Sequence, residues 1–322
     1  MLIKMSMSVG LIAKVLTDKG VLKTVLIIYA FLITGSTIAQ NNHSQFFKPS
    51  DTLNVSRKNA VIITEASLAS LSIIGLNALW YSDFERSNLH STNDNSEWFK
   101  MDKLGHSFTA YQLGRFGSQA LHWSGVSKKN QLIYGATLGF SFLTAVEVLD
   151  GFSEEWGFSW GDFTANAAGA GLFIGQELLW EEQRVQLKYS FNQSPYANQN
   201  PDKPGNGVFE EFIKDYNGQT YWLSANLHSF FKDSKLPKWL NLAVGYGVDG
   251  LLYGTDQLQN INFPNQDRTK QFYLSLDMDL TKIKTDSTFF KQLFNIINVI
   301  KVPFPTLEIN SSGKLKGHLI YF

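Results

Sequence analysis

The feature that most constrains the fold is a set of polar pairs within segments that are otherwise apolar or rich in small residues. The pairs are Asp102 with His106, Glu147 with Asp150, and Asp162 with Asn166. Members of a pair are three or four residues apart, so on a helix they share one face. Because a buried carboxylate needs a partner, the three faces are expected to converge on one polar site.

Four segments with helical spacing of apolar residues make up a predicted helical domain at residues 57–184, after a polar lead-in at 40–56. These segments are residues 59–80, 103–123, 132–149 and 160–184. In the segment 59–80, Glu65 and Asn77 are the only strongly polar residues after its first residue. The segment is long enough to cross a bilayer, which takes about 20 residues. Its Ser and Ala content equally fits a buried helix.

The start of the fourth segment carries a capping pattern. Ser159 followed by Asp162 fits a capping box, with Phe158 and Phe163 as a hydrophobic staple. Two faces of small residues follow, and both are expected to permit close helix packing. They consist of Gly161, Ala165 and Gly169, and of Ala167, Gly171 and Gly175.

Residues 185–322 form a predicted antiparallel β region, which makes the fold class α+β. Six segments have β character: residues 185–191, 221–231, 240–252, 271–280, 306–310 and 315–322. In 221–227 and 272–278 one face is apolar or aromatic and the other polar, as in a strand buried on one side. Complete outer-membrane barrels start at about eight strands, so we expect an open sheet or a partial or small barrel.

Two further patterns favour a membrane. Residues 287–300 are amphipathic, which predicts a segment that lies at a membrane surface or covers a sheet edge. The C-terminus, with Gly317, Ile320 and Phe322, resembles the C-terminal signal of outer-membrane β-barrel proteins, although Leu315 departs from the polar residue usual there.

Residues 1–39 are typical of an export signal. Lysines precede the apolar run 25–33, and Thr37 and Ala39 predict cleavage after Ala39. The stretch before Lys14 is long, so translation starting at Met5 or Met7 is an alternative, as is an uncleaved membrane anchor.

Composition narrows the function classes. There are 28 basic and 28 acidic residues, so no net charge favours nucleic acid as a partner. The sequence has no cysteine, which excludes a disulfide and a lipid anchor on a mature N-terminal cysteine.

The polar site has three interpretations. Its acids and histidine, namely Asp102, His106, Glu147, Asp150 and Asp162, are a suitable ligand set for a divalent metal. Alternatively, His106 acts as a base oriented by Glu147 or Asp150, with Lys103 or Arg115 binding an anionic substrate.

The third interpretation, which we favour, is a structural polar network that also includes Tyr111, Arg115 and Asn166. In it Asp162 serves as a helix cap and Asp102 stabilises the start of its helix.

Several motifs resemble a known family. Residues 102–106 (DKLGH) with Tyr111 and Arg115, 147–153, 156–163 with Asn166 and Gly169, and 214–224 are similar to the YfiM-like family of predicted periplasmic proteins. The resemblance covers residues 60 to 255 and implies a cell-envelope location without an established activity. The order Lys103, His106, Glu147, Asp162 and Asn166 is also distantly similar to VanZ-like membrane proteins.

Together these patterns predict an exported envelope protein associated with the outer membrane, a non-enzymatic component that has envelope proteins as partners. One alternative is a metal-dependent or His/acid hydrolase or transferase that acts on an envelope lipid or glycan. Another is a polytopic, VanZ-like inner-membrane protein.

Overall fold

The computed structural model describes residues 46–77, 81, 84–196, 199 and 208–322. The chain divides into two compact units, Met1–Lys48 and Pro49–Phe322, and everything below concerns the second unit. The predicted signal peptide and its cleavage site after Ala39 lie outside the described residues.

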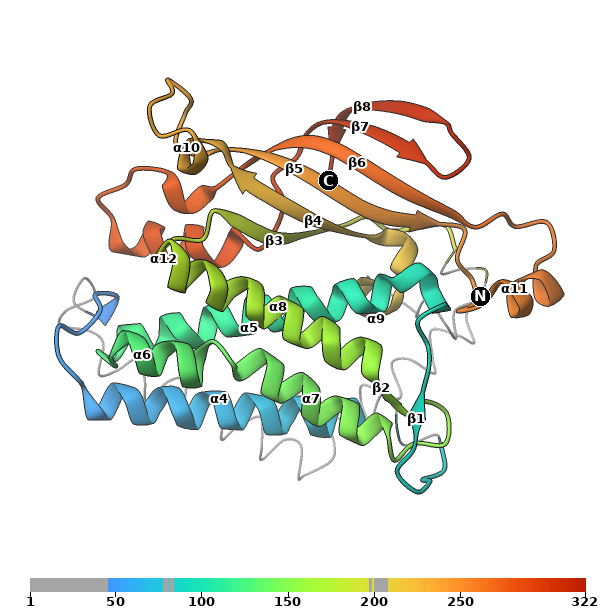
Figure 1. Ribbon diagram of the computed structural model, residues 1–322, viewed down its shortest axis with the longest axis horizontal. Coiled ribbons are helices and arrows are strands. Elements are labelled where there is room, and N and C mark those ends of the chain that lie inside the picture. The colour runs from blue at the N-terminus through green and yellow to red at the C-terminus, as the bar shows by residue number, and fades with distance from the viewer. Residues whose placement is uncertain (1–45, 78–80, 82–83, 197–198, 200–207) are drawn as a thin grey trace, which may run out of the picture. The chain divides into compact units, whose positions relative to one another are not determined.

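The first half of the second unit is a layer of helices (Figure 1). Its helices are α4 (Val55–Leu76), α5 (Met101–Trp123), α6 (Lys128–Asn130), α7 (Leu138–Asp150) and α8 (Trp160–Leu179). The predicted helix 132–149 is divided, because a π-helical turn η3 (Gln131–Gly135) precedes α7. The prediction of a domain of four helices is therefore not confirmed in that form.

Helix α5 is the centre of this layer and packs against α4, α7 and α8. Close approach depends on glycine: a Cβ added to Gly169 would overlap the carbonyl oxygen of Ser107, and one added to Gly139 would overlap that of Ala110. The predicted face with Ala165 and Gly169 thus packs against α5.

The second predicted small-residue face of α8 packs against nothing in the part of the chain that the structure describes. A Cβ added to Gly171 or Gly175 would meet no atom within 4 Å. The sequence pattern predicts that both faces permit close packing, and at Gly171 and Gly175 no neighbouring element of the described chain uses that possibility.

Two helical stretches of the described residues, Val55–Leu76 and Lys128–Asp150, are long and apolar enough to cross a membrane, a property that buried helices of soluble proteins share. Of the residues of α4, Val61 alone is buried. Within the described chain α4 is therefore a peripheral helix and not a core helix.

The second half is a six-stranded antiparallel sheet in the order β3-β4-β5-β6-β7-β8. The strands are β3 (Val185–Phe191), β4 (Gln219–Asn226), β5 (Leu240–Asp249), β6 (Thr269–Met278), β7 (Phe304–Asn310) and β8 (Leu315–Tyr321). Strands β3 and β8 remain as its two edges, so the sheet is open. The predicted α+β class and the antiparallel sheet are confirmed.

Short elements connect the strands or precede them. They are β1 (Ser91–Thr92), η2 (Glu97–Lys100), β2 (Phe158–Ser159), α9 (Val208–Lys214), η4 (Tyr216–Gly218), α10 (Leu227–Phe230), α11 (Asp256–Asn262), η5 (Leu280–Lys282) and α12 (Thr288–Ile297). Strand β4 ends earlier than the predicted 221–231, because the Asn226 side chain accepts from the Ser229 N–H and starts α10.

The amphipathic segment contains α12, and the residues after it lie along the edge of β3. Tyr189 N–H donates to the carbonyl of Val299 at 3.0 Å, and Lys301 N–H donates to the carbonyl of Tyr189 at 3.0 Å. These bonds cover part of an edge that would otherwise leave backbone groups unpaired.

The buried face of the sheet carries many polar groups around a small cluster formed by Trp222, Ala243 and Tyr273. Lys188 and Asp277 form a fully buried ion pair at 2.9 Å, and the Trp222 indole N–H donates to Ser190 Oγ at 2.8 Å. The alternation predicted for 221–227 and 272–278 is present, but Leu223 and other apolar side chains lie on the exposed face. The sheet therefore has the reverse of the usual soluble arrangement, in which the apolar face is buried.

Replacing two glycines of α8 tests the packing of the helical layer. Gly169→Ala is expected to lower the free energy of unfolding by about 1–3 kcal/mol, because the methyl group overlaps the α5 backbone. Gly171→Ala has open space and is expected to raise it by about 0.5–1 kcal/mol through helix propensity. Thermal or denaturant unfolding of the purified protein measures both. Equal effects of the two substitutions would contradict the close contact of Gly169 with α5.

Candidate functional site

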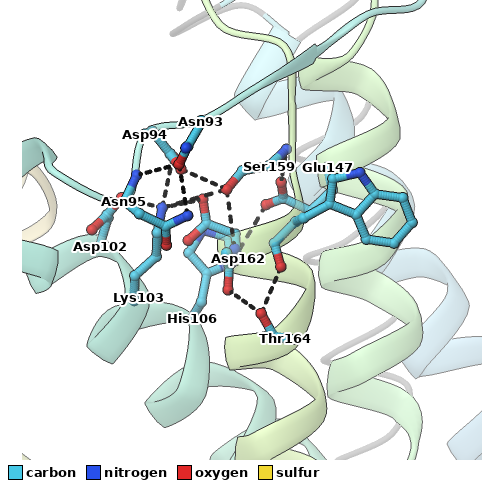
Figure 2. Close-up of polar contacts among 12 residues, drawn as sticks. Asn93, Asp94, Asn95, Asp102, Lys103, His106, Glu147, Ser159, Asp162 and Thr164 are labelled. Atoms are coloured by element: carbon cyan, nitrogen blue, oxygen red, sulfur yellow. Dashed lines mark hydrogen bonds and ion pairs between the residues drawn. The ribbon is translucent and has the colours of Figure 1, made fainter.

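A polar cluster lies where the N-terminal ends of α5 and α8 meet the C-terminal end of α7 (Figure 2). The loop after β1 adds a fourth segment, held in place because β1 pairs in parallel with β2. The cluster comprises Asp94, Asp102, Lys103, His106, Glu147, Ser159, Asp162 and Asn166. The structure thus brings together members of all three predicted polar pairs.

Lys103 is surrounded by carboxylates. Its Nζ lies 2.6 Å from Asp94 Oδ2, 2.8 Å from Asp102 Oδ2 and 3.0 Å from Asp162 Oδ2, and its side chain is 10% exposed. Burial alone would lower the pKa of Lys103, but the charge of Asp102 and hydrogen bonds to Asp102 and Asp94 raise it above its usual value. Lys103 therefore remains a cation with no free position for an anionic substrate.

His106 faces two acids and an amide. Its Nδ1 lies 3.0 Å from Asn166 Oδ1 and 3.6 Å from Glu147 Oε1, while its Nε2 lies 3.9 Å from Asp162 Oδ1. The histidine is the most accessible of these groups, with 22% of its side chain exposed.

Glu147 is 1% exposed, and its Oε2 accepts from the backbone N–H of Ser159 at 3.2 Å. Burial, together with the negative charges of Asp162 and Asp150, raises the pKa of Glu147 to about 8. The sequence expectation that this acid needs a partner is consistent with these contacts.

Asp150 lines the same cavity as His106 and Glu147, but its side chain bonds to Tyr81. Its Oδ1 accepts from the Tyr81 hydroxyl at 2.6 Å, and burial raises the pKa of Asp150 to about 6. One ligand atom each from His106, Glu147 and Asp162 lies within 4.8 Å of the others, and Asp94, Asp102 and Asp162 form a second such group. The five predicted ligands thus do not form one set, since Asp150 belongs to neither group.

The predicted capping box is only half present. Ser159 is the N-cap of α8, and its Oγ accepts from the Asp162 N–H at 3.1 Å. The Asp162 carboxylate does not return to the Ser159 N–H, which donates to Glu147. Asp162 is therefore not a capping side chain, because Glu147 satisfies the group that it would have capped.

Tyr111 and Arg115 belong to another part of the molecule. The Tyr111 hydroxyl donates to Gln183 Oε1 at 3.1 Å, and Arg115 donates to Gln112 Oε1 at 2.8 Å and to the carbonyl of Asn295 at 3.1 Å. They connect α5 to α12 and to the chain after α8. Of the three residues predicted as one structural network, only Asn166 contacts the polar cluster.

Sequence reasoning missed Asp94 and Tyr81. Both lie in or beside the polar stretch between the first two predicted helices, where no periodicity relates a side chain to a helix face. Only the pairing of β1 with β2 brings the Asp94 loop over α5 and α8.

A cavity of about 350 Å³ adjoins the cluster. His106, Glu147, Asp150 and Asp162 line it, together with aromatic side chains that include Trp156 and Tyr216. The cluster is thus largely buried, and its acidic and histidine side chains border the cavity.

Residues 92–175 match the sequence profile of a family described as "Predicted periplasmic lipoprotein (DUF2279)". The matched range runs from β1 to near the end of α8 and contains Asp94 and every charged residue of the cluster. A search of curated proteins and a search of solved structures each found no match.

The raised pKa of Glu147 predicts a pH dependence of stability. An acid whose pKa rises on folding binds more protons in the folded state, so stability is highest below the unfolded value and falls as the pH rises toward about 8. Glu147→Gln is expected to flatten this decline, whose slope is at most about 1.4 kcal/mol per pH unit. Unfolding in the presence of a chelator from pH 5 to pH 9 measures it, and parallel curves for the two proteins would contradict the assignment.

Proposed function

We propose that the protein is a non-enzymatic component of the bacterial cell envelope whose β-sheet contacts the lipid of the outer membrane. The observation that carries this proposal is the reversed polarity of the sheet. The match of residues 92–175 to a predicted periplasmic lipoprotein family supports an envelope location and membrane association.

The exposed face of the sheet carries continuous apolar rows. Strand register aligns Leu223 with Val244, Val244 with Leu274, and Leu274 with Leu307, across β4 to β7. These four side chains are between 41% and 50% exposed. A second row follows the register from Phe272 through Ile309 to Leu315 on the edge strand β8.

The opposite face satisfies its polar groups internally. Ser224 Oγ donates to Asp277 at 2.7 Å, Thr306 Oγ1 donates to Ser275 Oγ at 2.8 Å, and His318 lies 2.7 Å from Glu308. Apolar residues outside and polar residues inside are the pattern of sheets whose outer solvent is hydrocarbon. A protein interface, in contrast, is a bounded apolar patch with a polar rim.

The two central strands are long enough for this environment, whereas β3, β7 and β8 have 7 residues each and β4 has 8. β5 and β6 each have 10 residues, and a strand that crosses a bilayer needs about 9–11. The apolar sheet face is a means of membrane association that needs no lipid-bearing cysteine.

The finer assignments are part of the proposal. They are residence in the outer membrane, cleavage after Ala39, envelope protein partners, and membership of the YfiM-like family with a distant VanZ-like relationship. Separation of inner and outer membranes by density, followed by N-terminal sequencing, tests the membrane residence and the cleavage site. Recovery in the inner membrane with Met1, Met5 or Met7 retained would contradict the first two.

A second candidate function is a metal-dependent or His/acid hydrolase or transferase that acts on an envelope lipid or glycan. The cavity beside His106 and Glu147 favours it, because a reactive group must be accessible to a substrate.

Charged substitutions on the sheet test the lipid contact. The double substitution Val244→Arg/Leu274→Arg is expected to abolish flotation of purified protein with phosphatidylethanolamine and phosphatidylglycerol vesicles. Each arginine costs about 2–4 kcal/mol at the bilayer midplane. The matched control is Ile261→Arg on α11, which is 69% exposed but outside the strand rows; it should float like the wild type.

Two results would contradict the lipid assignment. One is wild-type protein that stays in solution without detergent and does not float. The other is a doubly substituted protein that floats as well as the wild type.

A further inference from the structure

The polar cluster contains two groups of possible cation ligands, and the protein itself neutralises only one. The group of Asp94, Asp102 and Asp162 surrounds the Lys103 ammonium, which lies within 3.0 Å of an oxygen from each acid. The group of His106, Glu147 and Asp162 has no lysine or arginine within ion-pair distance of its inner oxygens, Glu147 Oε1 and Asp162 Oδ1, among the described residues.

Asp162 divides its carboxylate between the two groups. Oδ2 accepts from Lys103, while Oδ1 is buried without a hydrogen-bond partner in the described part of the chain. The residue is 6% exposed, and Oδ1 points toward the imidazole of His106, 3.9 Å from Nε2. A buried carboxylate oxygen without a hydrogen-bond partner is energetically costly, which favours a cation beside it.

The orientation of His106 makes Nε2 a donor of electrons. Nδ1 lies 3.0 Å from the amide oxygen of Asn166, which can only accept, so Nδ1 carries the proton. Nε2 then has a lone pair directed to the same side as Asp162 Oδ1. Metal-binding histidines are commonly fixed in this way, with the second ring N–H donated to an oxygen.

A backbone hydrogen bond also orients the Glu147 carboxylate toward His106. Its Oε2 accepts from the Ser159 N–H, and its Oε1 faces the imidazole of His106, 3.6 Å from Nδ1. One imidazole nitrogen and two carboxylate oxygens are a donor set that suits Zn²⁺ or Mn²⁺, whereas Ca²⁺ and Mg²⁺ take oxygen ligands alone.

We propose that His106, Glu147 and Asp162 bind one divalent transition-metal ion of the Zn²⁺ class, with a coordination position open to the adjoining cavity. A tetrahedral Zn²⁺ ion holds neighbouring ligand atoms about 3.4 Å apart. The pair Nε2 and Oδ1, now 3.9 Å apart, needs a contraction of about 0.5 Å, and the three residues, whose ligand atoms lie within 4.8 Å of one another, need at most about 1.4 Å. The inference goes beyond the proposed function and does not depend on it.

Metal binding to untagged, full-length protein tests the proposal. After removal of metal with a chelator, the protein in detergent is titrated with Zn²⁺, and bound metal is counted by elemental analysis. We expect one Zn²⁺ per chain for the wild type. Asp162→Asn and Glu147→Gln should each weaken binding by more than about 100-fold, because each removes a direct ligand.

Asp150→Asn is the matched control, since Asp150 is a half-buried acid on the same cavity, bonds to Tyr81 and belongs to neither ligand group. It should keep one Zn²⁺ per chain. Asn166→Ala should weaken binding by about 10–100-fold by releasing the imidazole, and Asn166→Asp should restore it, which a purely structural role would not predict.

Far-UV circular dichroism of each variant separates loss of metal binding from loss of the fold. The proposal is wrong if folded wild-type protein binds no Zn²⁺, if Asp162→Asn binds it as tightly as the wild type, or if Ca²⁺ binds as tightly as Zn²⁺. Vesicle flotation with and without chelator tests membrane association separately. A protein that binds no Zn²⁺ but still floats would contradict the metal site and leave the proposed membrane association intact.

Discussion

The arrangement of the helical layer depends on the burial of one cation. Lys103 enters the interior of the cluster because three carboxylates from the β1 loop, α5 and α8 surround its ammonium group. A buried charge is tolerated only with such partners, so the contact fixes the positions of the three segments relative to one another. The same contact occupies one oxygen of Asp162 and leaves the other facing His106.

Close backbone packing and polar pairing act together here. Gly169 allows α8 to approach α5 until the two backbones touch, next to the cluster that Asp162 and Asn166 form with His106. The approach brings short side chains within bonding distance across the helix interface. In the sheet, polar pairs such as Lys188 and Asp277 lie on the buried face, and rows of apolar side chains lie on the exposed face.

Part of the site could be predicted from sequence. The spacing of Glu147 and Asp162 within apolar segments indicated that both would be buried near His106, because the helical period defines which residues share a face. The period could not show that Asp150 turns to Tyr81, or that Arg115 lies at the other end of the layer. Those outcomes depend on long-range neighbours.

The sequence by itself determined the α+β class, a helical half before a β half and the six strands of the main sheet, because hydrophobic periods of about 3.6 and 2 residues are local properties. Only the tertiary structure decided which face of the sheet is buried, since alternation separates two faces without saying which one meets the solvent. It also decided that the Ser159 N–H bonds to Glu147 and not to Asp162. This hydrogen bond forms because α7 and α8 meet at the cluster, and it leaves the Asp162 carboxylate free of a capping role.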